Sequence, residues 1–480
     1  MQKNAALKSS MEKVQEELKS DLLKEEAKPK WKENKMGTER IASLMLSMGI
    51  PMILSMILQA CYNIVDSMFV GRMDDGECAL TALTVAFPVQ MLIVAFSIGT
   101  GVGVNALLSR SLGQHDGEKT SKTAGNGMFL GMVIYLLFIL FGLFGVNGYL
   151  KTQTKNPVVF GYAKTYLKIC CILSFGIVMF SIFEKLLQST GKTVLSTTAQ
   201  ILGAATNIIL DPIMIFGYLG CPKLGIAGAA YATVIGQMVS FVLAAVFHFA
   251  HNKEVKSGWK YLKPDKKIIK EIYMIGLPAI IMQALMSLMT YGVNIIFNRV
   301  SEAAVTAYGI FYKIQQFLFF AAFGLRDAIT PIVSFNYGKG SKKRVMEGIR
   351  FGVIYTLIIM VAGIIGFQIF AVPISKMFGL EGSTVDLCVK AIRIISPGFI
   401  FAGINIALQG VFQALECGMS SLVVSLLRLL IVVLPLAWIF SRLTNAATMI
   451  WFAFPIAELA AAVMAVIFMV KAAKKVNRMI

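Results

Sequence analysis

Long apolar runs separated by short polar breaks are the dominant pattern along this 480-residue chain. The runs are roughly 20 residues or longer, the length that an α-helix needs to cross a hydrocarbon layer of about 30 Å. The pattern predicts about twelve membrane-spanning helices, at 41–70, 80–110, 124–148, 160–188, 193–217, 225–250, 272–298, 304–335, 346–371, 387–413, 419–440 and 446–470. We therefore expect an all-α polytopic membrane protein.

The composition agrees with this expectation, because 57% of the residues are hydrophobic and only 15% are charged. A mean hydropathy of +0.72 lies outside the range of soluble globular proteins. The first apolar run follows a charged leader of about forty residues and is too long for the h-region of a signal peptide. We therefore expect the first helix to be retained.

Lysine and arginine predict the orientation, because short cytoplasmic loops are enriched in both. They gather in every second break and in the tail, at Arg110, Lys119, Lys122, Lys192, Lys253, Lys256, Lys260, Lys263, Lys266, Lys267, Lys270, Lys339, Lys342, Lys343, Arg344, Lys471, Lys474, Lys475 and Arg478. The other breaks hold single basic residues and an acidic stretch at 73–77. This bias predicts a multi-pass protein of the cell inner (plasma) membrane with both termini in the cytoplasm.

The net charge of +19 follows mostly from this topology and from attraction to anionic lipids of the inner leaflet. Membrane lipids are thus the expected partners of the basic residues. Nucleic-acid binding is the competing explanation of a basic chain, but the charges sit beside the spans, so we expect no nucleic-acid partner.

The two halves of the chain repeat each other. "GIPMILSMILQACYNIVDSMFVGR" (49–72) matches "GLPAIIMQALMSLMTYGVNIIFNR" (276–299), and Gln90 and Ser109 match Gln315 and Ser334 in the following spans. Because each half has an even number of helices, both enter the membrane from the same side, as in secondary transporters with a cavity between two lobes. We predict two pseudo-symmetric six-helix lobes.

The repeat and the charges divide the chain into five parts. They are a charged cytoplasmic leader (1–40), an N-terminal lobe (41–250), a basic cytoplasmic linker (251–271), a C-terminal lobe (272–470) and a basic cytoplasmic tail (471–480). The leader mixes both charge signs and is compatible with a surface helix from Lys8 to Ala27 or with a solvated tail.

Enzyme motifs fail on inspection. "STGKT" (189–193) resembles part of a phosphate-binding loop, but Leu186 stands where that loop needs its first glycine. The three histidines have no HExxH context and the seven cysteines no CxxC spacing, so we expect no metal site and no cofactor. The only observation in favour of a disulfide between Cys78 and Cys221 is that both lie in loops predicted on the outer side of the membrane.

Motifs in order along the chain resemble the MATE family, the multidrug and toxic compound extrusion transporters. They are "GIPMI", "NIVDSMFVGR", "SRSLGQ", "NIILDPIMIFG", "GIAGAAYATVIGQ", "GLPA" and "PIVSFNYGKGSKKR". The resemblance spans nearly the full length of the chain. Each motif alone is weak evidence for the family, but their order along the chain makes the match specific.

This resemblance implies two lobes that open alternately to each side and export organic cations against an inward flux of H⁺ or Na⁺. In the bacterial branch that the chain resembles, the ion site lies in the N-terminal lobe. When the motifs are matched residue by residue, the ion-site positions of that branch correspond to Asp66 in the first span, Asn207 and Asp211 in the fifth and Thr233 in the sixth. Pro51 matches the proline that can bend the first helix in that branch.

The residues themselves fit this role. A carboxylate inside a span costs about 2.5–3.5 kcal/mol on insertion scales, so it usually faces a cavity or a partner. Asn207 and Asp211 are four residues apart and share one helix face, and Pro212 leaves a carbonyl near Ile208 without its donor. These oxygen ligands suit a proton or Na⁺ rather than a transition metal. If Asp66 shares the pocket, repulsion between the two carboxylates permits proton exchange near neutral pH.

Structural roles for the two carboxylates stay open at this stage. Asp66 lies about one turn from the outer end of its span and can reach water there. Asp211 can cap or stabilise a turn beside Pro212.

Charged residues also lie inside the C-terminal lobe. We expect Arg428 and Glu458 to form a structural ion pair, and Asp327, beside Arg326, to be a further ion-pairing residue of the same lobe. Asp327, Glu458 and Arg428 are thus secondary candidates for the functional site. Another MATE branch uses carboxylates in helices 7 and 10, but 276–299 and 387–413 contain none, which favours coupling in the N-terminal lobe.

Secondary active multidrug efflux is therefore the predicted function, carried out by a monomer. The main alternative is a lipid-linked oligosaccharide flippase, which requires cavity-lining Arg and Lys side chains that the N-terminal lobe lacks. A membrane-embedded enzyme or a receptor would show a catalytic constellation or a large ligand domain, and the sequence has neither.

Overall fold

The computed structural model describes residues 33–256, 258–377 and 383–477, and these ranges contain helices and loops but no strand. Residues from Lys35 onward form one compact unit. The leader helix considered for Lys8 to Ala27 lies outside the described residues.

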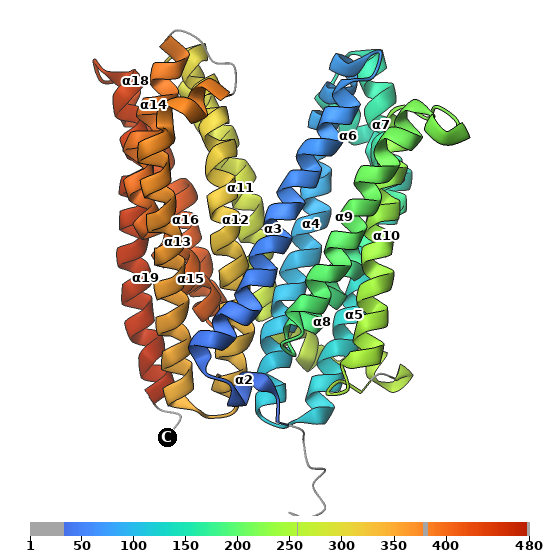
Figure 1. Ribbon diagram of the computed structural model, residues 1–480, viewed down its shortest axis with the longest axis vertical. Coiled ribbons are helices and arrows are strands. Elements are labelled where there is room, and N and C mark those ends of the chain that lie inside the picture. Colours follow the sequence, from blue (N-terminus) through green and yellow to red (C-terminus); the bar gives the residue numbers. More distant parts are fainter. Residues whose placement is uncertain (1–32, 257, 378–382, 478–480) are drawn as a thin grey trace, which may run out of the picture. The chain divides into compact units, whose positions relative to one another are not determined.

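The twelve predicted spans are present as helices (Figure 1). The N lobe consists of α3 (Ile41–Gly71), α4 (Gly76–Gly113), α5 (Gly117–Leu140) continued by a π-helical turn into α6 (Val146–Gln153), α7 (Pro157–Ile172) with α8 (Phe175–Gln188), α9 (Thr193–Phe216) and α10 (Ile226–His251). Among the described residues, eleven helices and one bent pair are long and apolar enough to cross a membrane, which confirms the prediction.

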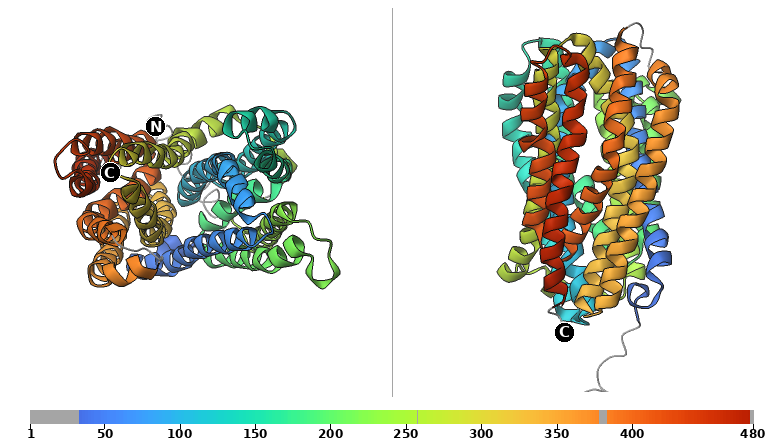
Figure 2. Two further views of the ribbon diagram at one scale, coloured as in Figure 1. Left: turned by 90° about the horizontal axis from the view of Figure 1, so that it is seen from above. Right: turned by 90° about the vertical axis from the view of Figure 1, so that its left-hand side faces the viewer.

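The C lobe repeats this organisation. It consists of α11 (Lys266–Asn298), α12 (Glu302–Gly338), α13 (Lys342–Met377), α14 (Ser383–Ile395) with α15 (Phe399–Ala414), α16 (Gly418–Leu426) continued by a π-helical turn into α17 (Val433–Phe440), and α18 (Ala446–Met449) continued into α19 (Ala453–Asn477). Figure 2 shows the two lobes from two further sides.

Two spans predicted as uninterrupted helices are broken in the middle. In the fourth span α7 and α8 meet at 45°. Gly176 starts α8 so close to α10 that a Cβ there would lie 2.8 Å from the backbone nitrogen of Met238. In the tenth span a 3₁₀ turn at Ser396–Gly398 separates α14 from α15. Pro397 is responsible, because proline has no N–H for the helix ladder and favours a first helical turn.

The basic linker is shorter than predicted, because α11 begins at Lys266 rather than at 272. Asp265 is the N-cap, and its side chain accepts hydrogen bonds from the backbone N–H groups of Lys267 (2.9 Å) and Ile268 (3.5 Å). The linker is held against α5, where Asn126 accepts a bond of 2.8 Å from the backbone N–H of Asp265 and donates one of 3.4 Å to the carbonyl of Lys263.

Helices also extend into the predicted leader and tail, although α3 begins at Ile41 as predicted. The short helix α2 (Lys35–Thr38) lies within the predicted leader, yet Met36 is fully buried and its carbonyl accepts hydrogen bonds from Asn336 and Arg344, both at 3.0 Å. At the other end α19 continues to Asn477, well past the predicted start of the tail at 471.

The lobes meet through the halves of α3, α4, α11 and α12 that lie near the linker. Glycines permit the close approach: a Cβ at Gly103 would overlap the carbonyl of Ile272, and a Cβ at Gly338 would overlap that of Arg110. Ser334 also donates a hydrogen bond of 2.6 Å to the carbonyl of Ala106 across the same junction. The structure is therefore closed between the lobes at the linker end.

Candidate functional site

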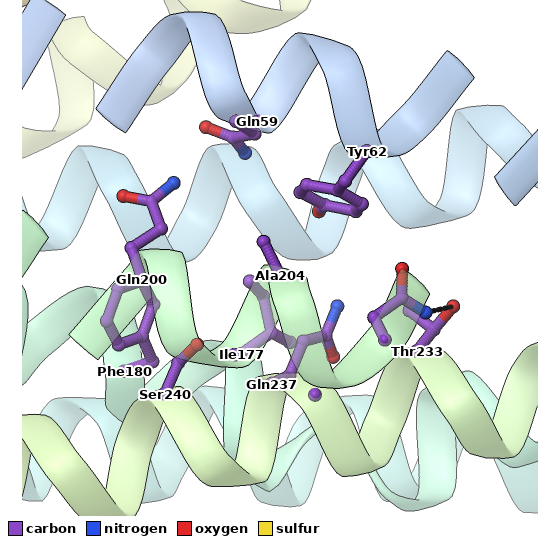
Figure 3. Close-up of a pocket in the computed structure, with 12 residues that line it drawn as sticks. Gln59, Tyr62, Ile177, Phe180, Gln200, Ala204, Thr233, Gln237 and Ser240 are labelled. Atoms are coloured by element: carbon purple, nitrogen blue, oxygen red, sulfur yellow. Dashed lines mark hydrogen bonds between the residues drawn. The ribbon is translucent and has the colours of Figure 1, made fainter. Parts of the chain in front are cut away.

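The four residues expected at the ion site come from three helices of the N lobe. Asn207 and Asp211 lie one turn apart on α9 and are 3% and 0% exposed, and Thr233 on α10 is 8% exposed. The Asn207 amide donates to Asp211 Oδ1 at 3.2 Å and to Thr233 Oγ1 at 3.5 Å, the second bond being dashed in Figure 3. One face of α9 is thus turned toward α10, as the four-residue spacing predicts.

Asp66 on α3 completes this set, which we call the N-lobe polar group. Its carboxylate lies close enough to that of Asp211 for the two charges to interact. Three buried oxygens of the group have no hydrogen-bond partner, namely Asp66 Oδ1, Asn207 Oδ1 and Asp211 Oδ2. Buried acceptors without a donor are rare in proteins, so these atoms indicate a place for a proton or a small cation.

The N-lobe polar group contains no built-in counter-charge. Within the described residues neither Asp66 nor Asp211 forms a salt bridge, whereas Asp74, Asp327 and Glu458 all do. Two neighbouring carboxylates taken out of water are costly unless a cation or a proton compensates them.

Sequence reasoning missed one polar neighbour of the group, Tyr166 on α7. Its hydroxyl accepts a hydrogen bond of 3.1 Å from Gln90 on α4 and lies near Thr233. Tyr166 is 2% exposed and stands among apolar residues, so no motif distinguishes it from an ordinary core tyrosine. In the sequence, Gln90 is distinguished only by its match with Gln315 in the second repeat.

A cavity of about 40 Å³ adjoins the group between α3, α9 and α10 (Figure 3). Its polar lining is uncharged and includes Gln59, Gln200, Gln237 and Ser240. This volume has room for about two or three water molecules. Hydrated access to Asn207 and Thr233, which also line the cavity, is therefore sterically possible.

Both notable prolines lie inside continuous helices. Pro212 has no N–H, so the carbonyl of Ile208 lacks its helical donor, one turn from the polar group. Pro51 lies inside α3, and its carbonyl accepts a hydrogen bond of 2.9 Å from Thr197 on α9. One turn further on, Ser55 is hydrogen-bonded to Gln200. These two contacts tie α3 to α9 at the position where a bend is expected.

The expected ion pair in the C lobe is present. Arg428 and Glu458 lie 2.6 Å apart and are largely buried. Asp327 differs from the expectation: besides Arg326 at 2.8 Å, it binds Lys185 of α8 at 2.7 Å. The expected pairing of Asp327 within the C lobe is present, and only its second pair, with the N lobe, was not predicted. The reason is tertiary, because Lys185 comes from the other lobe and is 2% exposed.

The cysteines considered for a disulfide are both free thiols, Cys221 being exposed and Cys78 partly buried.

Comparison with known proteins shows the family. The MatE family model matches residues 51–213 and again residues 278–439, one match in each lobe. The multidrug export protein MepA of Staphylococcus aureus strain MRSA252 is 24% identical over 420 residues, which cover 85% of this chain and 89% of that protein.

Solved structures show the same fold. One described as the outward-facing conformation of a multidrug resistance MATE family transporter of the MOP superfamily has a TM-score of 0.88 at 21% identity, covering 94% of this chain and 100% of the other. A MATE structure in the straight conformation has a TM-score of 0.87 at 22% identity, covering 92% and 98%. The chain is therefore a multi-pass membrane protein that belongs to the MatE family of transporters, which are not enzymes.

Proposed function

We propose that this protein is a secondary active efflux transporter that exports organic cations by antiport with H⁺ or Na⁺. The observation that carries the proposal is the pair of interacting carboxylates, Asp66 and Asp211, in an N-lobe polar group with no basic partner among the described residues. The name of the staphylococcal relative, a multidrug export protein, supports an exported small molecule.

In the proposed cycle the coupling ion binds Asp66 and Asp211, with Asn207, Thr233 and the free carbonyl of Ile208 as further oxygen ligands. A ligand shifts a conformational equilibrium only through its different affinity for the two states. Neutralising the carboxylates removes their repulsion and allows α3 to close on α9. Bending of α3 at Pro51 would break the contacts of Thr197 and Gln200 with α3, so these contacts favour the straight helix.

The orientation forms part of the proposal. With the basic linker in the cytoplasm, both termini are cytoplasmic and the closed contact between the lobes lies on the cytoplasmic side. The structure then represents an outward-facing state in the inner membrane. All residues of the N-lobe polar group come from one chain, so we propose that a monomer suffices for transport.

The flippase alternative is not favoured by the charges at the junction of the lobes. A pyrophosphate would need free basic side chains, but Lys185 and Arg326 both bind Asp327. Both cationic groups therefore already have a carboxylate partner.

Transport in proteoliposomes tests the function directly. Purified protein should move a fluorescent organic cation against its gradient when ΔpH or a Na⁺ gradient is imposed separately. The gradient that drives transport identifies the coupling ion. Dye movement that follows only the membrane potential, equal with and without either ion gradient, would show that the protein is not an H⁺ or Na⁺ antiporter.

The proposed topology has its own test. A cysteine at the exposed position 260 of the linker is expected to resist an impermeant maleimide added to whole cells and to react after the cells are opened. Native Cys221, exposed in a loop on the opposite side, provides the matched control, because it should react from outside, and peptide mass spectrometry assigns the label to position 221 or 260. Labelling of Lys260→Cys from outside would reverse the assignment of both termini.

A further inference from the structure

The repeat gives the N-lobe polar group an equivalent position in the C lobe. In the match of 49–72 with 276–299, Asp66 falls on Val293, an apolar residue that is 0% exposed. The last spans begin at Ile226 in the N lobe and at Ala446 in the C lobe, which places Glu458 more than one turn beyond the equivalent of Thr233. The first helix of the C lobe therefore has no carboxylate at this position, whereas its last helix carries Glu458.

An arginine accompanies the carboxylate of Glu458. Arg428 lies on the π-helical turn between α16 and α17, in the span that corresponds to α9 of the N lobe. Its Nε and Nη2 both donate to Glu458 Oε1, at 2.9 and 2.6 Å. Asn405 on α15 donates to Glu458 Oε2 at 2.8 Å. The guanidinium is 7% exposed and faces the ring of Phe319, whose centre is 5.9 Å away.

The two lobes thus differ in charge balance. The N-lobe polar group has two carboxylates and no basic side chain, so it is neutral only with added cations. The C-lobe set has one carboxylate and one guanidinium, and it is neutral by itself. An arginine stays protonated at any physiological pH, so neither a proton nor Na⁺ can exchange with it during a transport cycle.

We propose that Arg428 is a tethered cation that permanently neutralises the carboxylate of Glu458 in the C lobe, and that its removal opens a monovalent-cation site on Glu458 and Asn405. As a consequence, only the N lobe binds coupling ions in the native protein. This proposal rests on the proposed function only in taking the N-lobe polar group as the native ion site.

An unpaired oxygen supports a cation site rather than a simple strut. Asn405 is 0% exposed, and its Oδ1 has no hydrogen-bond partner although its amide nitrogen binds Glu458. Without the guanidinium, Glu458 Oε1 becomes a second oxygen acceptor beside it. A carboxylate and an amide carbonyl are the hard ligands that a monovalent cation accepts.

The test measures cation binding by thermal unfolding in detergent and does not depend on transport. All proteins carry Asp66→Asn and Asp211→Asn, so that the N-lobe polar group contributes no cation response. Added Arg428→Ala should lower the melting temperature, and Na⁺ or millimolar guanidinium should restore it saturably at pH 8. Choline at equal ionic strength should not restore it.

The matched control is Arg428→Ala combined with Glu458→Gln, which removes the carboxylate and should show no cation response. Arg428→Lys keeps a tethered charge and should also show none. An Arg428→Ala protein that ignores Na⁺ and guanidinium, or that responds equally after Glu458→Gln, would overturn the proposal. Failure to recover folded Arg428→Ala protein when Na⁺ or guanidinium is present during purification would do the same. Because Asp66 and Asp211 are neutral throughout, a wrong assignment of the native ion site does not change these outcomes.

Discussion

Asp211→Asn protein is expected to insert and fold but to lose gradient-driven export of cationic dyes. The substitution fixes the side chain in a neutral form, so ion binding can no longer favour one conformation over the other. Coupling free energies between two ligands are typically about 1–3 kcal/mol, which corresponds to a loss of roughly 5- to 150-fold in coupled transport. The amide can still accept the hydrogen bond of Asn207 at the present Oδ1 position. Initial rates in proteoliposomes under an imposed ΔpH or Na⁺ gradient measure the effect.

Two comparisons make this result specific. Asp74→Asn is the matched control, because Asp74 is exposed in the loop between α3 and α4 and pairs only with exposed Lys223, so export should be unchanged. Asp66→Asn should resemble Asp211→Asn, and the double variant should be little worse than either, because residues that form one site are not additive. Full export by well-folded Asp211→Asn protein would move the search for the coupling carboxylate to Asp327 and Glu458.

Lys185→Met should destabilise the closed junction between the lobes. Lys185 Nζ binds Asp327 Oδ2 at 2.7 Å and Gln188 Oε1 at 2.9 Å, in surroundings that leave the lysine 2% exposed. Removing one partner of a buried pair typically costs about 3–5 kcal/mol. Arg326 still neutralises Asp327, which places the expected loss near the lower end of that range. Thermal unfolding in detergent measures it.

An exposed ion pair between the two lobes provides the control for this prediction. Lys119 and Glu271 are also 2.7 Å apart and also link α5 of the N lobe with α11 of the C lobe, but their side chains are 30% and 36% exposed. Pairs of this kind contribute roughly 0–1 kcal/mol, so Lys119→Met should change stability little. Adding Asp327→Leu to Lys185→Met would leave Arg326 buried and unpaired and should lower stability further. Equal melting temperatures for Lys185→Met and Lys119→Met would show that the buried pair does not stabilise the junction.

The pattern of apolar and polar residues by itself determined the number of spans, the repeat and the helix face shared by Asn207 and Asp211. The physical reason is that a lipid bilayer leaves the backbone of a long apolar run few alternatives to a helix, and residues four apart on a helix share a face. The charge pair of Arg428 and Glu458 was also predictable, because both are ionised groups within one lobe and a membrane interior forces such groups to pair.

Contacts between distant segments were decided by the tertiary structure. Lys185 meets Asp327 across the two lobes and Tyr166 lies near Thr233, because helix packing places together side chains that are far apart in the sequence. The break between α7 and α8 was likewise not predicted, and close to it Gly176 packs against the backbone of α10. The spacing of polar residues along the sequence predicts which face of a helix is polar. Only the packing of the helices decides which other face it meets.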